Sequence, residues 1–213
     1  MDLVTERLML LVPLVLSLSV HEWAHAFVAH RLGDDTAKEQ GRLTLDPTAH
    51  IDLVGTILLP ALGIPFGWAK PVPVDPSRFR KGVSPASGML WTALAGPASN
   101  LVLAGLGIVV LGVVLATLPL HRAPDQLLAI FVQLNVSLAL FNLLPIPPLD
   151  GSRVIDRFLP ASMQASWNAI RAQGSLLLIG VVIVMNQLDV DLFAWPRRLA
   201  AALALSLAHG LGA

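Results

Sequence analysis

Long apolar runs separated by shorter polar or proline-rich stretches dominate the pattern along this chain. The four longest runs cover residues 8–29, 89–118, 127–144 and 175–188. As an α-helix rising about 1.5 Å per residue, each of the first two can cross a hydrocarbon core about 30 Å thick. The third is shorter and carries Asn135 and Asn142, whose amides need protein partners because lipid offers none. The fourth run is marginal as a span when taken alone.

A stretch of different character lies between the first two runs. Its apolar part is interrupted by Gly55, Pro60 and Gly63, and such breakers favour short strands and turns. Residues 51–64 would extend only about 21 Å as a helix, so we expect them to enter the membrane and return to the same side. Prolines in the following segment, residues 68–76, keep that segment extended.

A last apolar run, residues 199–207, is short enough to be a tilted or interfacial helix. The pattern therefore predicts an all-α integral membrane protein. It has about five to six membrane helices or part-helices, with a short re-entrant, strand-like segment between the first two long helices. No repeat or linker divides the chain, so we expect one domain over residues 1–213, with a core at residues 8–155 and C-terminal helices at residues 160–213.

Composition agrees with a membrane location. Hydrophobic residues make up 55% of the chain and charged residues 13%, and the mean hydropathy of +0.71 is too high for an ordinary soluble domain. The run after Arg7 could belong to a secretory signal peptide, but it continues from Val20 to Ala29 without a helix breaker and is better interpreted as a span. The charges balance and form no basic patch, so nucleic acid is not an expected partner.

The first run contains His21-Glu22-Trp23-Ala24-His25, an HExxH sequence. On a helix, histidines four residues apart project from one face and can hold one zinc ion. Glu22 stands beside the first histidine, where it can take a proton from a zinc-bound water, whose pKa the metal lowers toward about 7. Coincidence is the alternative, but polar groups deep in an apolar helix are costly unless they face a cavity, pair or bind metal.

A catalytic zinc site of this kind needs a third protein ligand. The chain has no cysteine, so that ligand is a nitrogen or an oxygen. We favour Asp150, because prolines end the third apolar run shortly before it and Gly151 follows it. In the alternative interpretation, Asp150 lies in solvent in an ordinary helix-ending turn. Spacing alone also leaves other acids and histidines open as candidates: Asp52, Asp156, His30, His50, His121 and His209.

These motifs resemble the site-2 protease family of intramembrane metalloproteases, which pairs HExxH on one membrane helix with an Asn-to-Leu-Asp-Gly motif on a later one. Here the second motif runs from Asn142 to Gly151. Segments within residues 33–52, 68–74 and 95–100 are also similar to the family's short prokaryotic members. Over these 213 residues we do not expect the PDZ-like or nucleotide-sensing domain of some relatives.

The resemblance implies that His21, His25 and Asp150 are the ligands of one Zn²⁺ ion and that Glu22 is the general base. It also implies that Asn142 orients the substrate or stabilises the oxyanion.

Asn100 and His50 are further candidates for contact with the substrate or the oxyanion. Asn100 either lines the cavity opposite the metal or forms a hydrogen bond between helices, worth about 0.6 to 2 kcal/mol. His50 lies beside the re-entrant segment, although a lone histidine in a turn is more often a surface residue.

The zinc hypothesis requires the HExxH end of the first helix and Asp150 to lie near the same membrane face. If the re-entrant segment does not cross, ten of the lysine and arginine residues fall on that face and four on the other. Because these residues mark the cytoplasmic side of short loops, we expect the active-site mouth to face the cytoplasm. The resemblance to prokaryotic members places the protein in a prokaryotic inner or plasma membrane.

The sequence thus predicts a zinc metalloendopeptidase that hydrolyses peptide bonds within or near transmembrane helices of membrane protein substrates. Two extended edges, residues 42–45 and 70–74, are expected to hold an unwound substrate segment by strand addition. The alternatives are a catalytically silent relative that binds membrane helices, or a metal carrier, neither of which needs Glu22. A soluble zinc protease is disfavoured by the hydropathy, and the oligomeric state is left open.

Overall fold

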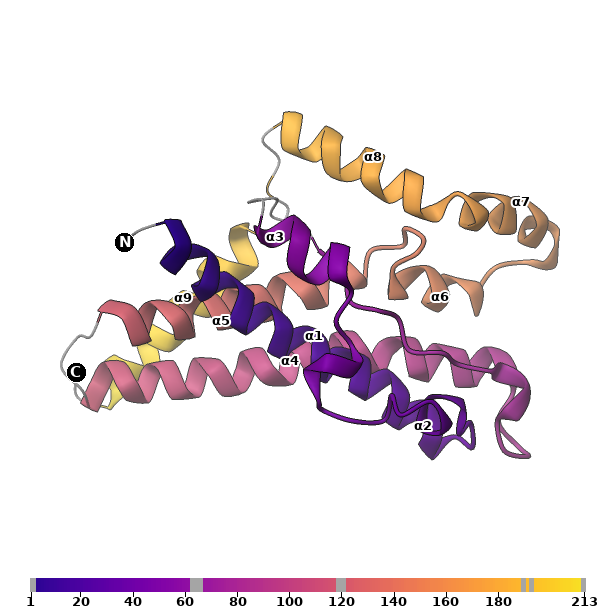
Figure 1. Ribbon diagram of the computed structural model, residues 1–213, viewed down its shortest axis with the longest axis horizontal. Coiled ribbons are helices and arrows are strands. Elements are labelled where there is room, and N and C mark those ends of the chain that lie inside the picture. Colours follow the sequence, from indigo (N-terminus) through magenta and orange to yellow (C-terminus); the bar gives the residue numbers. More distant parts are fainter. Residues whose placement is uncertain (1–2, 62–66, 118–121, 189–190, 192–193, 212–213) are drawn as a thin grey trace.

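The computed structural model describes residues 3–61, 67–117, 122–188, 191 and 194–211, and these residues form helices and loops without a β-strand (Figure 1). The long helices are α1 (Leu3–Arg31), α4 (Pro85–Thr117) and α5 (Arg122–Asn142). Each contains a stretch long and apolar enough to cross a membrane, namely Met9–Arg31, Pro85–Thr117 and Asp125–Asn142. The predicted all-α membrane fold is confirmed.

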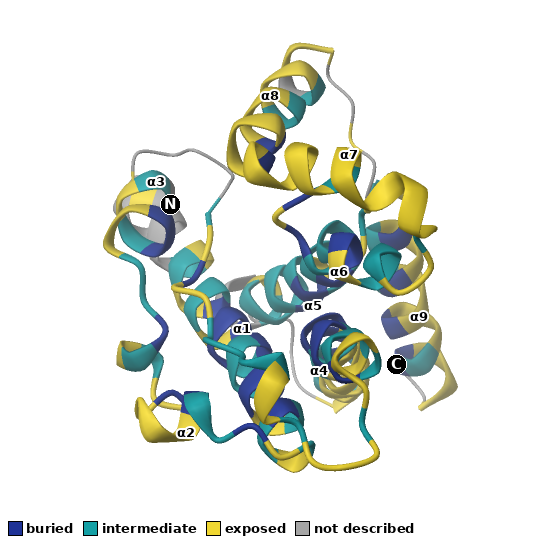
Figure 2. Ribbon diagram, turned by 90° about the vertical axis from the view of Figure 1, so that its right-hand side faces the viewer, coloured by how far each residue is buried: buried dark blue, intermediate teal, exposed yellow. Residues whose placement is uncertain are grey.

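Helix α4 lies at the centre of the bundle, where it contacts α1, α5 and α9 (Ala194–Gly210). Small residues allow this close approach, because without bulky side chains the helix backbones can come together. The buried small residues of α4 are Gly88, Ala93, Gly96, Ala104, Gly107 and Gly112. Figure 2 shows the buried parts of α1 and α4 turned toward the interior of the bundle, while large apolar side chains such as Val102 and Leu106 remain exposed on the outer face of α4.

Four further helices lie in the described C-terminal part of the chain. The expected run at residues 199–207 belongs to the longer α9, which buries Ala200, Ala204 and Ala208 at four-residue spacing. In the sequence, α5 and α9 are separated by α6 (Asp150–Asp156), α7 (Ala161–Ala172) and α8 (Gly174–Gln187). Helices α7 and α8 meet at 70°, and together they are long and apolar enough for a broken span or a re-entrant loop.

The connection from α1 to α4 differs in detail from the strand-like segment that the sequence predicts. Its described residues form short helical turns: α2 (Thr36–Glu39), η1 (Pro47–Ala49), the π-helical η2 (Leu53–Leu58), α3 (Leu59–Ala61) and η3 (Pro76–Arg78). The Asp52 carboxylate accepts hydrogen bonds from the backbone N–H groups of Val54 and Gly55, so it caps a helical turn. Residues 62–64 of the expected re-entrant segment lie outside the described residues.

The chain nevertheless returns to the end of the bundle that it left. Lys70 N–H donates to the carbonyl of His50 (2.9 Å), and Trp68 N–H donates to the carbonyl of Gly55 (3.3 Å). The Thr56 hydroxyl donates to the carbonyl of Trp68 (2.8 Å). Residues 50–56 and 68–70 therefore run side by side, as expected of a re-entrant segment. We call residues 68–75, which continue in an extended conformation along the end of α1, the strap.

Candidate metal centre

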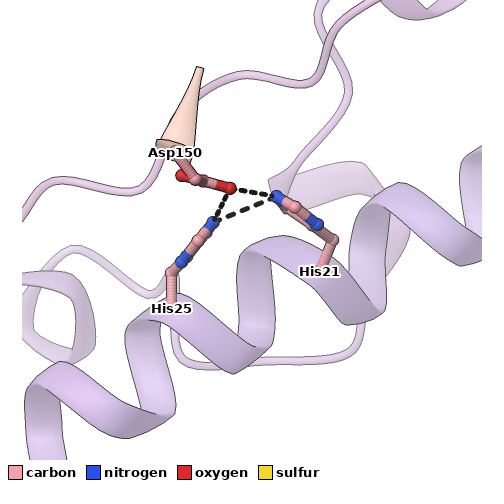
Figure 3. Close-up of side chains that lie close together, drawn as sticks. All are labelled: His21, His25 and Asp150. Atoms are coloured by element: carbon pink, nitrogen blue, oxygen red, sulfur yellow. Dashed lines mark hydrogen bonds and ion pairs between the residues drawn. The ribbon is translucent and has the colours of Figure 1, made fainter. Parts of the chain in front are cut away.

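Three side chains from two distant parts of the chain converge beside the C-terminal half of α1. Nε2 of His21 and Nε2 of His25 lie 3.2 and 3.3 Å from Oδ2 of Asp150 (Figure 3). The two Nε2 atoms lie 3.0 Å from each other. Each of the three residues thus offers one ligand atom to a common point, with all three atoms within 4.8 Å of one another.

The helical spacing of the two histidines produces their half of the site. Residues four apart on α1 lie about one turn apart on the same face, and the imidazole rings stand edge to face with centroids 4.6 Å apart. Both side chains are buried. The site therefore lies inside the helical bundle and not on its surface.

Asp150 reaches the histidines because the chain turns sharply between α5 and α6. Helix α5 ends at Asn142, and α6 begins at Asp150 after a turn rich in proline. A β-carbon on Gly151 would lie 2.2 Å from the carbonyl oxygen of Leu143 and 2.4 Å from that of Leu144. Only glycine permits this approach, so the Asp-Gly pair brings the carboxylate against the end of α5.

Helix α4 fixes the orientation of both imidazole rings. Nδ1 of His21 lies 2.6 Å from Oδ1 of Asn100, and Nδ1 of His25 lies 2.6 Å from the carbonyl oxygen of Thr92. Because a carbonyl oxygen can only accept, the Thr92 contact places the hydrogen of His25 on Nδ1. Oδ1 of Asn100 likewise places the hydrogen of His21 on Nδ1, because the amide nitrogen of Asn100 donates to Asn135 and its oxygen faces His21. Both Nε2 atoms therefore present lone pairs to the common point, which is the arrangement typical of metal-binding histidines.

The donor set fits a zinc ion. When both imidazoles are neutral and carry their hydrogen on Nδ1, two Nε2 lone pairs and a carboxylate oxygen face one another, and Oδ2 of Asp150 is buried without a hydrogen-bond partner among the described residues. Such an arrangement is repulsive unless a cation neutralises it. Tetrahedral bonds of about 2.1 Å separate neighbouring ligand atoms by about 3.4 Å, close to the 3.0–3.3 Å found here.

A chain of buried amides extends from His21 into the bundle. Nδ2 of Asn100 donates to Oδ1 of Asn135 (2.9 Å), and Nδ2 of Asn135 donates to the Ser17 hydroxyl (2.8 Å). The protein partner expected for Asn135 is thus present. Asn100 is fully buried and is absent from the described lining of the cavity, so it lies behind His21 and forms the interhelical hydrogen bond that was its alternative interpretation.

A cavity of about 460 Å³ opens beside the three ligand atoms. Its lining includes Glu22 and Asn142 along with apolar residues from α1, α4, α5, α8 and the strap. Asn142 also donates Nδ2 to the carbonyl of Leu138 on its own helix. His50 does not line this cavity in the described structure. It is buried, with Nε2 2.8 Å from the carbonyl oxygen of Thr44, and it helps to order the loop after α2.

Glu22 lies between the three candidate metal ligands and the strap. Its Oε2 accepts a hydrogen bond from the backbone N–H of Val72 (2.9 Å). The Arg42 guanidinium, which donates to the carbonyl of Lys70 in the strap, lies close enough to interact with the Glu22 charge. Burial lowers the pKa of Arg42, and the Glu22 carboxylate partly offsets this effect. Glu22 is therefore held by a backbone amide on one side and lies in the field of a cation.

Sequence reasoning missed three contributors to the site: the carbonyl of Thr92, the close approach of Gly96 and the N–H of Val72. A β-carbon on Gly96 would lie 2.5 Å from Cε1 of both His21 and His25. Two of these contributions come from the backbone, and the third is the absence of a side chain. No side-chain chemistry marks them in the sequence, although Gly96 does lie in a segment that resembles the site-2 protease family.

A histidine, histidine and aspartate centre beside a glutamate, inside a bundle of membrane helices, defines a membrane zinc metalloprotease. The sequence pattern of "Peptidase family M50" matches residues 120–186, which include Asn142 and Asp150. The chain belongs to peptidase family M50, the site-2 protease family.

Relatives extend this similarity over most of the chain. It is 42% identical over 175 residues to "Putative zinc metalloprotease YwhC" of Bacillus subtilis, covering 80% of this chain and 78% of that protein. It is 32% identical over 184 residues to "Putative zinc metalloprotease Rip2" of Mycolicibacterium smegmatis, covering 85% and 70%. The protein of the same name from Mycobacterium tuberculosis is 30% identical over 198 residues, covering 88% and 75%. No solved structure matches the chain significantly.

Proposed function

We propose that this zinc metalloprotease hydrolyses peptide bonds within or near the transmembrane helices of membrane protein substrates. The observation that carries the proposal is the convergence of His21, His25 and Asp150 inside a helical bundle, with Glu22 on the same cavity. One domain, residues 1–213 with a core at residues 8–155, performs this activity.

In this proposal, His21, His25 and Asp150 hold the zinc ion. When bound, zinc supplies a Lewis acid that polarises a carbonyl and increases the acidity of a water molecule. Glu22 accepts a proton from the attacking water and later passes a proton to the leaving amine nitrogen.

The remaining polar groups position these residues and the substrate. Asn100 and the Thr92 carbonyl keep each imidazole in the orientation that directs Nε2 to the metal. Asn142 lines the cavity with an amide that can donate to the substrate carbonyl as negative charge develops on it. Asn100 and His50, which are absent from the described lining of the cavity, act through protein contacts.

The size of the cavity favours a substrate segment in an extended conformation over a helical one. A helix with its side chains is about 10–12 Å wide and hides its carbonyls in internal hydrogen bonds, whereas the cavity measures about 460 Å³ and is largely apolar. A substrate helix must therefore unwind locally to present a carbonyl. The strap borders the cavity and offers backbone carbonyls to such an unwound segment by strand addition.

The distribution of charge supports an active-site mouth that faces the cytoplasm of a prokaryotic cell. Helix α2 and η3, which lie at the same end of the bundle as α6 (Figure 1), carry Lys38 and Arg78. Arg153 on α6 borders the cavity itself. Positively charged residues in short loops mark the cytoplasmic side.

A catalytically silent relative or a metal carrier remains the competing function, and Glu22 separates it from a protease. The test compares the wild-type protein with Glu22→Gln, reconstituted in phosphatidylethanolamine and phosphatidylglycerol vesicles with a pool of tagged single-span membrane helices. We expect Glu22→Gln to bind one zinc ion per chain and to lose cleavage by at least about 100-fold. Equal cleavage by both proteins would remove Glu22 as the base, and no cleavage by either protein across the pool would favour the silent relative.

A further inference from the structure

The backbone N–H of Val72 donates to Oε2 of Glu22 at 2.9 Å, across 50 positions of sequence. We propose that Val72 is a positioning residue, whose amide holds the Glu22 carboxylate in the orientation from which the carboxylate takes the proton of the attacking water. The inference rests on the proposed role of Glu22 as general base. In this proposal the strap orients a catalytic residue, in addition to lining the cavity.

The sequence around Val72 isolates this one donor. Val72 lies between Pro71 and Pro73, and proline has no backbone N–H. Between Lys70 and Val74, the amide of Val72 is therefore the only backbone donor that the strap can direct at Glu22. The two proline rings also fix φ near −65° on either side of Val72, which keeps this part of the strap extended.

Contacts before Val72 anchor the strap without involving Glu22. The Trp68 carbonyl accepts from the Thr56 hydroxyl (2.8 Å), and Lys70 N–H donates to the carbonyl of His50 (2.9 Å). The Lys70 carbonyl accepts from the buried guanidinium of Arg42. This half of the strap is therefore fixed to the loop after α2 and to the re-entrant segment.

A contact after Val72 anchors the other half. Asp75 N–H donates to Oδ2 of Asp34 (2.7 Å), whose carboxylate is fully buried at the end of α1. Oδ1 of Asp34 accepts from the N–H and the hydroxyl of Thr36 (2.9 and 2.5 Å), so Asp34 itself is held in place. Because the strap is anchored on both sides, the Val72 amide is in position before any substrate binds.

This arrangement has a clear use in catalysis. A glutamate side chain on a helix can rotate about three bonds, and each wrong orientation moves the carboxylate away from the water. Fixing Oε2 leaves Oε1 as the oxygen that receives the proton. Misplacing a catalytic group by about 1 Å can cost about 100-fold in rate, so loss of the Val72 donor is expected to lower kcat about 10- to 100-fold.

The same contact limits how a substrate can pair with the strap. The N–H groups of Lys70, Val72 and Asp75 already have acceptors within the protein. Over residues 70–73, where the other two residues are prolines, the strap can therefore only accept hydrogen bonds from a substrate segment.

Hydrogen exchange tests the contact without reference to activity. In the full-length protein, with and without zinc, fragments that differ by residues 71–73 report the amide of Val72 alone, because Pro71 and Pro73 carry no N–H. We expect Glu22→Ala to increase the exchange rate of the Val72 amide at least about 10-fold, since the amide loses its acceptor. The control is Asn142→Ala, which changes another residue of the cavity lining and should leave this rate unchanged. Equal rates in wild type and Glu22→Ala would overturn the proposal.

Kinetics test the role in catalysis. Val72→Pro and Val72→Ala both remove the valine side chain, but only Val72→Pro removes the amide hydrogen. On one helix of the pool that the wild-type protein cleaves, we expect kcat of Val72→Pro to be at least about 10-fold below that of Val72→Ala. The two variants should have similar KM and zinc content. A merely structural defect would change zinc content or KM as well. Equal kcat values for the two variants would refute the positioning role.

An ester variant covers the case in which Val72→Pro fails to fold. Replacing the amide between Pro71 and Val72 by an ester keeps the side chain and removes only the N–H, and the same fall in kcat is expected. These experiments also distinguish a failure of the positioning role of Val72 from a failure of the proposed function. If Glu22→Gln cleaves as well as wild type, the base is wrong even when Val72 exchange responds to Glu22; if Glu22→Gln is inactive but the ester variant is fully active, only the positioning role fails.

Discussion

A β-carbon on Gly96 would lie 2.5 Å from Nε2 of His25, one of the three candidate ligand atoms for the metal. The backbone of α4 is thus in direct contact with the imidazole rings. Intrinsic helix propensity favours alanine over glycine by about 1 kcal/mol, so glycine at this position is explained by the metal site and not by the helix.

Gly96→Ala is expected to displace the rings of both His21 and His25 and to lower zinc affinity at least about 10-fold. Competition with a chromophoric chelator measures this affinity. Gly105→Ala is the matched control, because it lies on the same helix and a β-carbon there meets no atom within 4 Å. If Gly96→Ala binds zinc as tightly as Gly105→Ala, the rings can adjust and the close approach is not required.

Gly151→Ala tests the other half of the site. The new β-carbon would lie within 2.4 Å of the carbonyl oxygens of Leu143 and Leu144, so α6 must move away from the end of α5 and take Asp150 with it. We expect a lower thermal midpoint and a loss of zinc affinity of at least about 10-fold. The control is Gly180→Ala on α8, where a β-carbon meets no atom within 4 Å. Wild-type zinc affinity in Gly151→Ala would show that Asp150 does not depend on this junction.

The parts of this site that follow from local sequence were predictable. The histidine pair depends on the spacing of one helix, and the ligand role of Asp150 was suggested by the proline-rich break and the following glycine. The long helices were predictable for the same reason, since length and hydropathy are properties of contiguous residues. The carbonyl of Thr92 and the amide of Val72 were not, because every residue has these groups and only the packing of distant elements directs them at His25 and Glu22.

The strand-like expectation for the segment after α1 failed for a related reason. Alternation and breakers indicate that a segment is neither a long helix nor a core strand, but they do not identify its hydrogen-bond partners. Here the carboxylate of Asp52 caps the turn that begins at Leu53, and the Thr56 side chain bonds the returning strap. These side-chain contacts satisfy backbone groups that a strand would pair with a neighbour.

Asn100→Leu tests whether the buried amide chain serves the metal. The substitution removes the acceptor from Nδ1 of His21 and leaves the amide of Asn135 without one partner. Groups that orient a metal ligand typically contribute about 10- to 100-fold in metal affinity, and we expect a loss in this range. Ser99→Ala is the control, because the Ser99 hydroxyl donates to the carbonyl of Gly96 within the same helix. An unchanged zinc affinity in Asn100→Leu would reduce the amide chain to a structural link between helices.

Asp34→Asn tests the anchor of the strap. The Asp34 carboxylate accepts from the backbone of Thr36 through one oxygen and from the backbone of Asp75 through the other. An amide has only one oxygen, so its NH₂ group must face one of these donors. Because Asp34 is fully buried, the unmatched donor should lower the free energy of unfolding by about 1–3 kcal/mol.

Asp46→Asn provides the comparison for this effect. Asp46 caps η1 through the backbone N–H of Thr48 but is exposed, and asparagine caps helical turns about as well as aspartate. The thermal midpoint should therefore fall in Asp34→Asn and change little in Asp46→Asn. Hydrogen exchange at Thr36 or at Asp75 should also rise in Asp34→Asn alone, because only that variant leaves one of these two amides without an acceptor. If neither amide exchanges faster while the midpoint falls, Asp34 does not anchor the strap through the Asp75 amide, and the Val72 amide must be held by the contacts of Trp68 and Lys70.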